Sequence, residues 1–322
     1  RLENLEEMEK EFDVLVAGEL NVDIILNNIQ AFPEIGKEIL ANDLSIVLGS
    51  SSAILASNLA SLGTRVAFTG KTGTDVFSQI VFETLSRRRV DCRHVIRDER
   101  YPTGATIVLN YGQDRANITF PGAMNHFGIN DIDFEFMSRA KHLHFSSCFI
   151  QPGMKKGLAE LFRKAKEMGL TTSMDPQWDP EEKWELPLEE LMPNVDVFMP
   201  NVVELKNITG ASSLENAVKK LRNLANLLVV KNGEEGAWLW DGQTLSHQPA
   251  FKNDQVIDCI GAGDSFNAGF LSEFVKKSSL TKCMETGALM GAINTTRAGG
   301  TAAFEDYNTV RAIAKERFNY NL

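Results

Sequence analysis

Short apolar runs alternate with longer segments of helical period along most of this chain. The apolar runs are Asp13 to Ala17, Val66 to Thr69, His142 to Ser146, Thr171 to Met174, Val197 to Met199 and Leu227 to Val230. Helical patterns lie between and after them, at Ser52 to Leu62, Val76 to Arg88, Lys155 to Met168, Leu214 to Asn223, Gly263 to Val275 and Thr281 to Arg297. Repeated strand, helix, strand units of this kind predict an α/β fold with a central, mainly parallel sheet.

Two stretches interrupt this order. They are residues 24–48 and 103–120, where β-branched residues alternate and no helix follows. We interpret them as a small separate sheet, inserted in two pieces, that forms a lid. The predicted fold is a doubly wound α/β sandwich with a small β-sheet lid, built by one domain over residues 12–322. Residues 1–11 are predicted to be an N-terminal extension.

The charge balance restricts the partners of the chain. A formal net charge of −10 predicts repulsion of nucleic acids and of anionic membranes, so neither is expected as a partner. No apolar run is long enough to span a bilayer. The four cysteines are scattered and form no Cys-x-x-Cys pair, which argues against a zinc site or a disulfide framework and favours the reducing cytosol.

The segment from Val256 to Phe270 is the most informative for function. It is predicted to run from a short apolar strand through a Gly-Ala-Gly turn into a helix of small and aromatic residues. Small residues at a helix start leave backbone N–H groups unobstructed, and the helix dipole adds positive potential, so an anion can bind there. Asp264 would lie in the first helical turn, ionised and facing the same pocket, where it could act as a base. The chemistry alone equally allows a plain helix cap after a tight turn.

Two other motifs suggest sites that we do not favour. His142 and His144 share one face of a predicted strand, but no third metal ligand accompanies them, so packed strand histidines are expected. The run Gly70-Lys71-Thr72 superficially resembles a P-loop. That motif needs a glycine at position 65, which is Arg65, and the residues between are strand-like.

The segment 256–270 resembles the second signature of the ribokinase-like PfkB family of carbohydrate kinases. Further motifs of that family occur in order from about Asp13 to about Phe304. The resemblance implies the ribokinase-like fold, a cytosolic kinase that uses ATP and Mg²⁺, and a homodimer, because lids in the family often meet. It also implies that Asp264 takes the proton of the acceptor hydroxyl, while N–H groups stabilise the transferred phosphoryl group. Those N–H groups belong to Gly261, Ala262 and Gly263.

The resemblance assigns the substrate, metal and nucleotide sites as well. Asp23, in the segment 18–23 that resembles the first strand and turn of the family, would bind sugar hydroxyls. Asn201 and Glu204 resemble the Asn-x-x-Glu motif that orders Mg²⁺ largely through water, a role that suits their oxygens. The same two residues are also a variant of the helix capping box, and both interpretations can hold at once.

The nucleotide would lie against two further segments. Lys231, Asn232 and Gly233 resemble the strand end and glycine turn beside the nucleotide phosphates, although a simple hairpin would also favour glycine there. Asn294 lies in a segment that resembles the adenine-side helix and loop of the family, and it would contact the nucleotide.

Two positions depart from the family pattern. The first signature gives Gly49 and Ser50 at the substrate site, but Ile54 in place of the usual sugar-binding asparagine. Asp179 stands where many sugar-acid and fructose kinases of the family carry a basic residue. We therefore expect a small neutral sugar, fructose-like or ribose-like, as the substrate. A nucleoside kinase of the same family and a non-catalytic ligand sensor are the alternatives.

Overall fold

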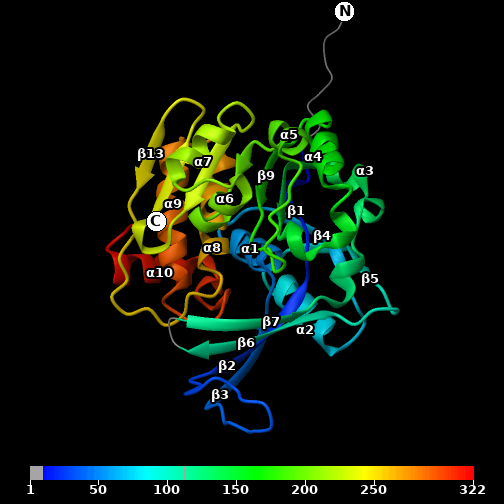
Figure 1. Ribbon diagram of the computed structural model, residues 1–322, viewed down its shortest axis with the longest axis vertical. Helices are drawn as coiled ribbons and strands as arrows, with labels where there is room; N and C mark the ends of the chain where they lie inside the picture. The colour runs from blue at the N-terminus through cyan, green and yellow to red at the C-terminus, as the bar shows by residue number, and fades with distance from the viewer. Residues whose placement is uncertain (1–9, 112–113) are drawn as a thin grey trace, which may run out of the picture.

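The computed structural model describes residues 10–111 and 114–322, so the predicted extension over residues 1–11 lies outside the described residues except for its last two. Within the described residues the strands form two sheets (Figure 1). The larger has the strand order β13-β12-β11-β10-β9-β8-β1-β4-β5, and the smaller has the order β3-β2-β6-β7. The main body and the separate small sheet confirm the predicted fold class.

The larger sheet is parallel except at one edge. Its strands are β1 (Phe12–Ala17), β4 (Val66–Thr72), β5 (Asp91–Arg97), β8 (Ala140–Ser146), β9 (Thr171–Asp175), β10 (Val197–Phe198), β11 (Leu227–Lys231), β12 (Ala237–Trp240) and β13 (Leu245–Gln248). The strands β12 and β13 run antiparallel to their neighbours. The sequence patterns missed β5, β12 and β13, because these strands lie at or near the edges of the sheet and carry many polar residues.

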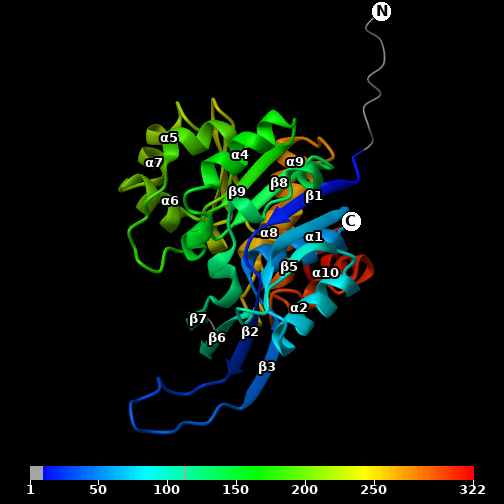
Figure 2. The ribbon, with the colours of Figure 1, turned by 90° about the vertical axis from the view of Figure 1, so that its right-hand side faces the viewer.

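Helices cover both faces of this sheet (Figure 2). One face holds α1 (Ser51–Ser61), α2 (Val76–Arg87), α8 (Ala262–Phe274), α9 (Leu280–Asn294) and α10 (Tyr307–Phe318). The other holds α3 (Phe134–Met137), α4 (Leu158–Glu167), α5 (Leu188–Leu191), α6 (Val202–Thr209) and α7 (Leu214–Leu221). Among the described residues, no helix combines the length and the apolar character that crossing a membrane requires.

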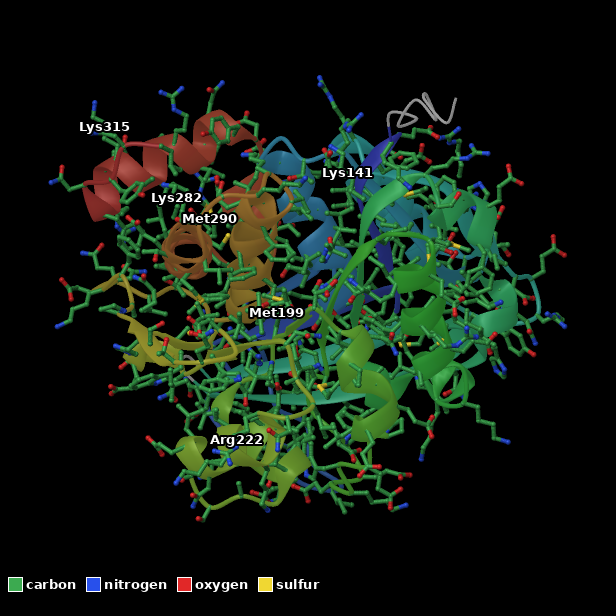
Figure 3. The ribbon with its side chains drawn as sticks, turned by 90° about the horizontal axis from the view of Figure 1, so that it is seen from above. Lys141, Met199, Arg222, Lys282, Met290 and Lys315 are labelled. Carbon is green, nitrogen blue, oxygen red and sulfur yellow. The ribbon has the colours of Figure 1, made fainter. Side chains whose placement is uncertain are left out.

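Alternate residues of the central strand β1 fill the two cores. Leu15 packs in the cluster with α4 and α7, whereas Val14 and Val16 pack in the cluster with α1 and α8. This period of two is what a strand buried on both faces imposes. Figure 3, a view from above, shows the buried interior and the charged surface of the protein: Met199 lies inside the molecule, and charged residues such as Lys315 lie at its rim.

The strand histidines are packed as expected. His142 and His144 are fully buried, and their ring nitrogens lie 2.7 Å from the hydroxyl oxygens of Thr171, Ser173 and Ser146. Burial lowers the pKa of His142 to about 3, so the ring is neutral. Within residues 10–111 and 114–322, no group of three or more His, Cys, Asp or Glu side chains is arranged to hold a metal.

The small sheet has two chemically different faces. Its strands are β2 (Asn21–Asn27), β3 (Asp43–Leu48), β6 (Gly104–Tyr111) and β7 (Asp114–Phe120). The residues Ile24, Ile46, Ile107 and Ile118 lie directly opposite one another on adjacent strands, and so share the outer face. The residues in register with Asp23 face the main body. Asp23 itself lies inside β2 rather than in a turn after a strand.

The segment before the Gly-Ala-Gly turn differs from the prediction. Residues 256–260 form a loop and not a strand. Val256 and Ile257 are exposed, whereas Ile260 is buried with Ile25 and Val108 of the small sheet. The apolar character of this run therefore serves a contact with the lid instead of a position in the sheet.

The run that superficially resembles a P-loop is part of a strand, although the sequence patterns ended that strand at Thr69. Gly70, Lys71 and Thr72 are the last residues of β4. The Lys71 ammonium is buried, lies 3.1 Å from the Asp131 carboxylate and donates to the His126 carbonyl at 2.9 Å. It holds the neighbouring loop and is not available to a phosphate.

Candidate active site

A pocket of about 2150 Å³ lies between the small sheet and the carboxyl ends of the parallel strands. Residues that follow β1, β8, β9, β10 and β11 line one wall, and residues of β2, β6 and β7 line the other. The carboxyl ends of parallel strands are where ligands bind in open α/β sheets. The start of helix α8 opens on the same pocket.

The turn at the start of α8 has a backbone shape that only glycine adopts without strain. Gly261 has a φ of 77°, and a Cβ at this position would lie 2.8 Å from the Cα of Gly300. Among the described residues, no acceptor is found for the N–H groups of Gly263 and Asp264, which lie in the first turn of the helix. Free N–H groups at a helix start can bind an anion, so this geometry is compatible with an anion site, which stays a prediction. The Ala262 N–H, however, donates to the Cys259 carbonyl at 3.2 Å, so its predicted role in binding the phosphoryl group is not supported.

Asn294 is buried next to this turn, is hydrogen-bonded to it and does not line the pocket. Its side chain is 1% exposed, donates to the Ile260 carbonyl at 2.6 Å and accepts the hydroxyl of Ser265 at 2.8 Å. Its predicted contact with the nucleotide stays a prediction, and this arrangement does not favour it, because both ends of the amide are engaged inside the protein. Asp258, which the sequence patterns did not single out, accepts the N–H groups of Ile260 and Gly299 at 2.8 and 2.9 Å.

Asp264 faces the pocket from the first turn of α8, in an environment that differs from our expectation. Its carboxylate accepts the Gln177 side-chain amide at 3.1 Å. Burial raises the pKa of Asp264 to about 8, and the nearby Asp175 and Glu19 carboxylates add to that rise, whereas Lys231 and a hydrogen bond with the Ser51 side chain oppose it. The sequence predicted an ionised carboxylate because the helix dipole favours one, but it gave no sign of two further acids nearby.

Asp175, at the end of β9, is the centre of a buried polar cluster. One of its oxygens, Oδ2, lies 2.5 Å from the Lys231 ammonium, 2.6 Å from the Asn267 amide and 3.0 Å from the Gln177 amide. Lys231 thus contacts α8 and β9 at once, and the Cβ position of Gly263 lies 3.8 Å from its Nζ. The sequence analysis placed Lys231 at the phosphates but gave no role in the site to Asp175, Gln177 or Asn267. The position of Asp175 at the carboxyl end of a predicted strand was the available signal.

The acceptor end of the pocket contains buried oxygens without partners. The Asp23 carboxylate is 7% exposed, and we find no hydrogen-bond donor to it within the described part of the chain. Burial raises its pKa to about 7, while the charge of Arg115, which lines the same pocket, opposes the rise and that of Asp258 adds to it. Asn21 donates to the Thr106 hydroxyl at 3.0 Å, but its own Oδ1 is buried without a partner among the described residues. A Cβ on Gly49 would overlap the Asp23 and Asn21 side chains, so Gly49 makes room for these acceptors.

Ser50 caps a helix, which is one of the roles that a serine has at such a position. Its hydroxyl accepts the Ala53 N–H at 2.9 Å and donates to the Glu19 carbonyl at 2.7 Å. Ser50 lines the pocket, but its hydrogen-bonding atoms are engaged at the start of α1. Ile54, which replaces the asparagine of the family pattern, packs against the Gly261 turn. Its side chain therefore supports the anion site.

Asn201 and Glu204 form the capping box that the sequence allows. Asn201 Oδ1 accepts the Glu204 N–H at 2.8 Å, and Glu204 Oε2 accepts the Asn201 N–H at 2.9 Å. Glu204 is 4% exposed at the edge of the pocket, and burial together with Asp175 raises its pKa to about 7. No donor to its second oxygen, Oε1, is found among the described residues, so that oxygen is available to a hydrated cation.

The segment Lys231-Asn232-Gly233 turns the chain from β11 into the antiparallel strand β12, so the hairpin interpretation is correct. Gly233 lines the pocket with a φ of 54° and open space beside its Cα. The Asn232 N–H donates to the Gly236 carbonyl at 2.8 Å, which closes the turn. A ligand could therefore approach the backbone at Gly233.

Comparison with known proteins agrees with this geometry. The model of the family described as "pfkB family carbohydrate kinase" matches residues 12–306. This chain belongs to that family. It is an ATP-dependent carbohydrate kinase, as the resemblance of its motifs implied.

The relatives are distant but cover most of the chain. An ATP-dependent 6-phosphofructokinase of Thermoanaerobacterium thermosaccharolyticum is 25% identical over 312 residues, which are 95% of this chain and 94% of the relative. Fructokinase-1 of Zea mays is 28% identical over 269 residues, 78% of this chain and 83% of the relative. The structure of Arabidopsis thaliana ribokinase complexed with ribose and ATP has a TM-score of 0.80 at 23% identity, over 93% of this chain and 97% of that one. This last likeness shows a shared fold.

The raised pKa of Asp264 predicts how stability depends on pH. A carboxyl whose pKa is higher in the folded state stabilises the fold below its unfolded pKa, near 3.8, and this stabilisation is lost as the pH rises through about 8. The melting temperature of the protein should therefore fall between pH 5 and pH 8.5, and it should fall less in Asp264→Asn. At pH 8.5 the variant should be the more stable by at least about 1.4 kcal/mol, the equivalent of one pKa unit.

Thermal and urea unfolding at several pH values, without ligands, would measure this difference. The matched control is Glu38→Gln at an exposed position, which should follow the parent at every pH. Parallel curves for the parent and Asp264→Asn would contradict the predicted environment of Asp264.

Proposed function

We propose that this kinase transfers the γ-phosphoryl group of ATP to a hydroxyl of a small neutral sugar, with Asp264 as the catalytic base. One observation carries the proposal. The Asp264 carboxylate and the free N–H of Gly263 face the same pocket as the unpartnered acceptors Asp23 and Asn21. A base, an anion site and a hydroxyl-binding site therefore share one enclosed space.

The chain offers suitable groups for ATP and Mg²⁺. The N–H groups of Gly263 and Asp264, the Lys231 ammonium and the open backbone at Gly233 lie along one wall of the pocket, where they can bind phosphate oxygens. The free oxygen of Glu204 can bind the water shell of Mg²⁺, with Asn201 holding Glu204 in place. Bound Mg²⁺ would neutralise charge on the phosphates during transfer.

The protein residues then have distinct roles in the reaction. Asp23 and Asn21 accept hydroxyl hydrogens and so orient the sugar. Asp264 accepts the proton of the attacking hydroxyl as its oxygen bonds to phosphorus, and the N–H groups of the α8 start stabilise the negative charge on the transferred group. The lid, which contacts the turn through Ile260, excludes water that would otherwise accept the phosphoryl group.

The acceptor end favours a neutral polyol for a reason different from the one the sequence suggested. Asp179 accepts backbone N–H groups of Glu181, Lys183 and Trp184 at 2.7 to 2.9 Å, so it organises its own loop. The selectivity comes instead from Asp23 and the Asn21 oxygen, which are acceptors without donors. Hydroxyl groups of a sugar can donate hydrogen bonds to these oxygens. A substrate carboxylate is itself an acceptor, so it would face the Asp23 and Asn21 oxygens without a hydrogen between them.

The outer face of the small sheet supports the proposal of a homodimer. Ile46, Ile107, Ile118 and Phe120 are 39 to 63% exposed there, and Ile35 in the loop between β2 and β3 is fully exposed. An apolar sheet face of this kind is expected to be covered by another surface. A second copy of the same face satisfies this in a symmetric pair, in which each lid covers the other.

Replacement of Asp264 by Asn tests the catalytic assignment. The amide has nearly the same size but cannot accept the proton, so kcat should fall by about 10²- to 10⁴-fold, while the KM values for ATP and the sugar change little. Single-turnover phosphoryl transfer with the best acceptor would measure this. Glu160→Gln, which removes an acid from the first turn of α4, is the matched control and should keep the parental rate. A folded Asp264→Asn protein with more than about a tenth of the parental kcat would refute the assignment.

A panel of acceptors tests the substrate class. ADP release should be faster with a neutral sugar such as D-fructose or D-ribose than with 2-keto-3-deoxygluconate, because the Asp23 end of the pocket binds hydroxyl donors. Adenosine, which has ribose hydroxyls of its own, tests the alternative of a nucleoside kinase. The comparison is of kcat/KM at fixed ATP and Mg²⁺. A larger kcat/KM for the sugar acid than for every neutral sugar would contradict the proposed class.

Sedimentation velocity tests the dimer. The protein should sediment as a dimer at micromolar concentration, and Ile118→Asp should convert it to a monomer, because a charge in the middle of the covered face would be desolvated without a partner. Tyr307→Asp, on α10 and outside the small sheet, is the control for an exposed aromatic residue and should stay dimeric. A monomeric parent protein would exclude this interface.

A further inference from the structure

Among the described residues, Gln177 is the side chain that donates both to the proposed base and to Asp175, the centre of the buried polar cluster. Its amide nitrogen, Nε2, lies 3.1 Å from Asp264 Oδ1 and 3.0 Å from Asp175 Oδ2. An amide nitrogen has two hydrogens, so it donates one to each carboxylate. The two acids therefore share a donor, so the position of Asp175 fixes the orientation of Asp264 through the Gln177 amide.

The Asp175 side chain is held in one place by its surroundings, so it can fix the position of groups that bind to it. It is fully buried, and its Oδ2 also accepts from the Lys231 ammonium and the Asn267 amide. Asn267 lies on α8, one turn after Asp264, and Lys231 lies on β11. The carboxylate is thus hydrogen-bonded to helix α8 and to strand β11 at the same time. A side chain that donates to it is therefore held in a fixed position as well.

The backbone of Gln177 holds its side chain in this place. Its φ is 61°, a left-handed conformation that a residue with a long side chain rarely adopts. The Gln177 N–H also donates to Asp175 Oδ1, at 3.2 Å, so the backbone and the side chain contact the same carboxylate. Strain of this kind persists only where the surroundings fix it, and it concentrates at functional sites.

We propose that Gln177 is a positioning residue for catalysis: it holds Asp264 Oδ1 so that the other oxygen, Oδ2, points at the acceptor hydroxyl. The inference rests on the proposed function, since it needs Asp264 to be the base. Gln177 need not touch the substrate for this role. Its donor also separates two carboxylates that would otherwise repel each other across the site.

Gln177→Leu removes the donor at similar size and tests the proposal. Because a base that is misplaced by about 1 Å can cost about a hundredfold, kcat should fall between about tenfold and a hundredfold, while the KM values for ATP and sugar stay close to the parental ones. Gln243→Leu, at an exposed turn, is the matched control and should keep the parental kcat. Gln177→Gly removes the same donor and relieves the strained φ, so it provides a folded variant if the leucine does not fit.

The double variant separates positioning from a merely structural role. If Gln177 acts through Asp264, then Gln177→Leu combined with Asp264→Asn should be no slower than Asp264→Asn alone. Additive losses, or a folded Gln177→Leu and Gln177→Gly with parental kcat, would overturn the inference. If Asp264→Asn itself keeps the parental rate, the proposed base has failed instead. The two failures are therefore distinguishable in one assay.

Discussion

The site depends on the desolvation of carboxylates at the carboxyl edge of the parallel sheet. Asp175 is fully buried there, and the donors to it among the described residues are the Lys231 ammonium, the side-chain amides of Asn267 and Gln177, and the Gln177 N–H. With Lys231 engaged by Asp175, further acids in the same region stay under-compensated, and burial raises the pKa of Glu204 to about 7 and that of Asp264 to about 8. Acids that sit near neutrality in this way are suited to taking up and releasing a proton.

The parallel topology is what brings these groups together. Glu19 follows β1, Asp175 ends β9, and Lys231 ends β11, so residues more than 200 positions apart meet at one edge. Because every parallel strand ends on the same side, the sheet collects polar ends there while its interior stays apolar. The start of helix α8 adds the backbone N–H groups of Gly263 and Asp264 to the same pocket. The chemistry of the pocket is therefore a consequence of strand direction as much as of residue type.

The sequence predicted the elements that have a strong period and the residues that belong to a local motif. The six central strands, the separate sheet and the capping box of Asn201 and Glu204 are all local patterns, and the structure contains them. The hydrogen bonds of Asn294 could not be predicted from the sequence, because its partners, Ile260 and Ser265, lie about thirty positions away in the chain. The ionisation of Asp264 was misjudged for the same reason, since Asp175 and Glu19 approach it only in the folded chain. A residue type can suggest a charge, but burial and distant neighbours decide it.

The packing of Ile260 against the small sheet explains why residues 256–260, which we predicted to be a strand, include a buried apolar side chain although they form a loop. A strand at residues 256–260 would have been held by the sheet, and its position would not depend on the lid. As a loop, this run is held by Asp258 on one side and by the packing of Ile260 against Ile25 and Val108 on the other. Ile260 immediately precedes Gly261, so a movement of the small sheet changes the support of the turn that carries the free N–H groups. Packed apolar contacts resist small displacements, because separation of the surfaces exposes them to water. The packing of Ile260 therefore connects the small sheet to the turn at the start of α8, and both parts line the same pocket.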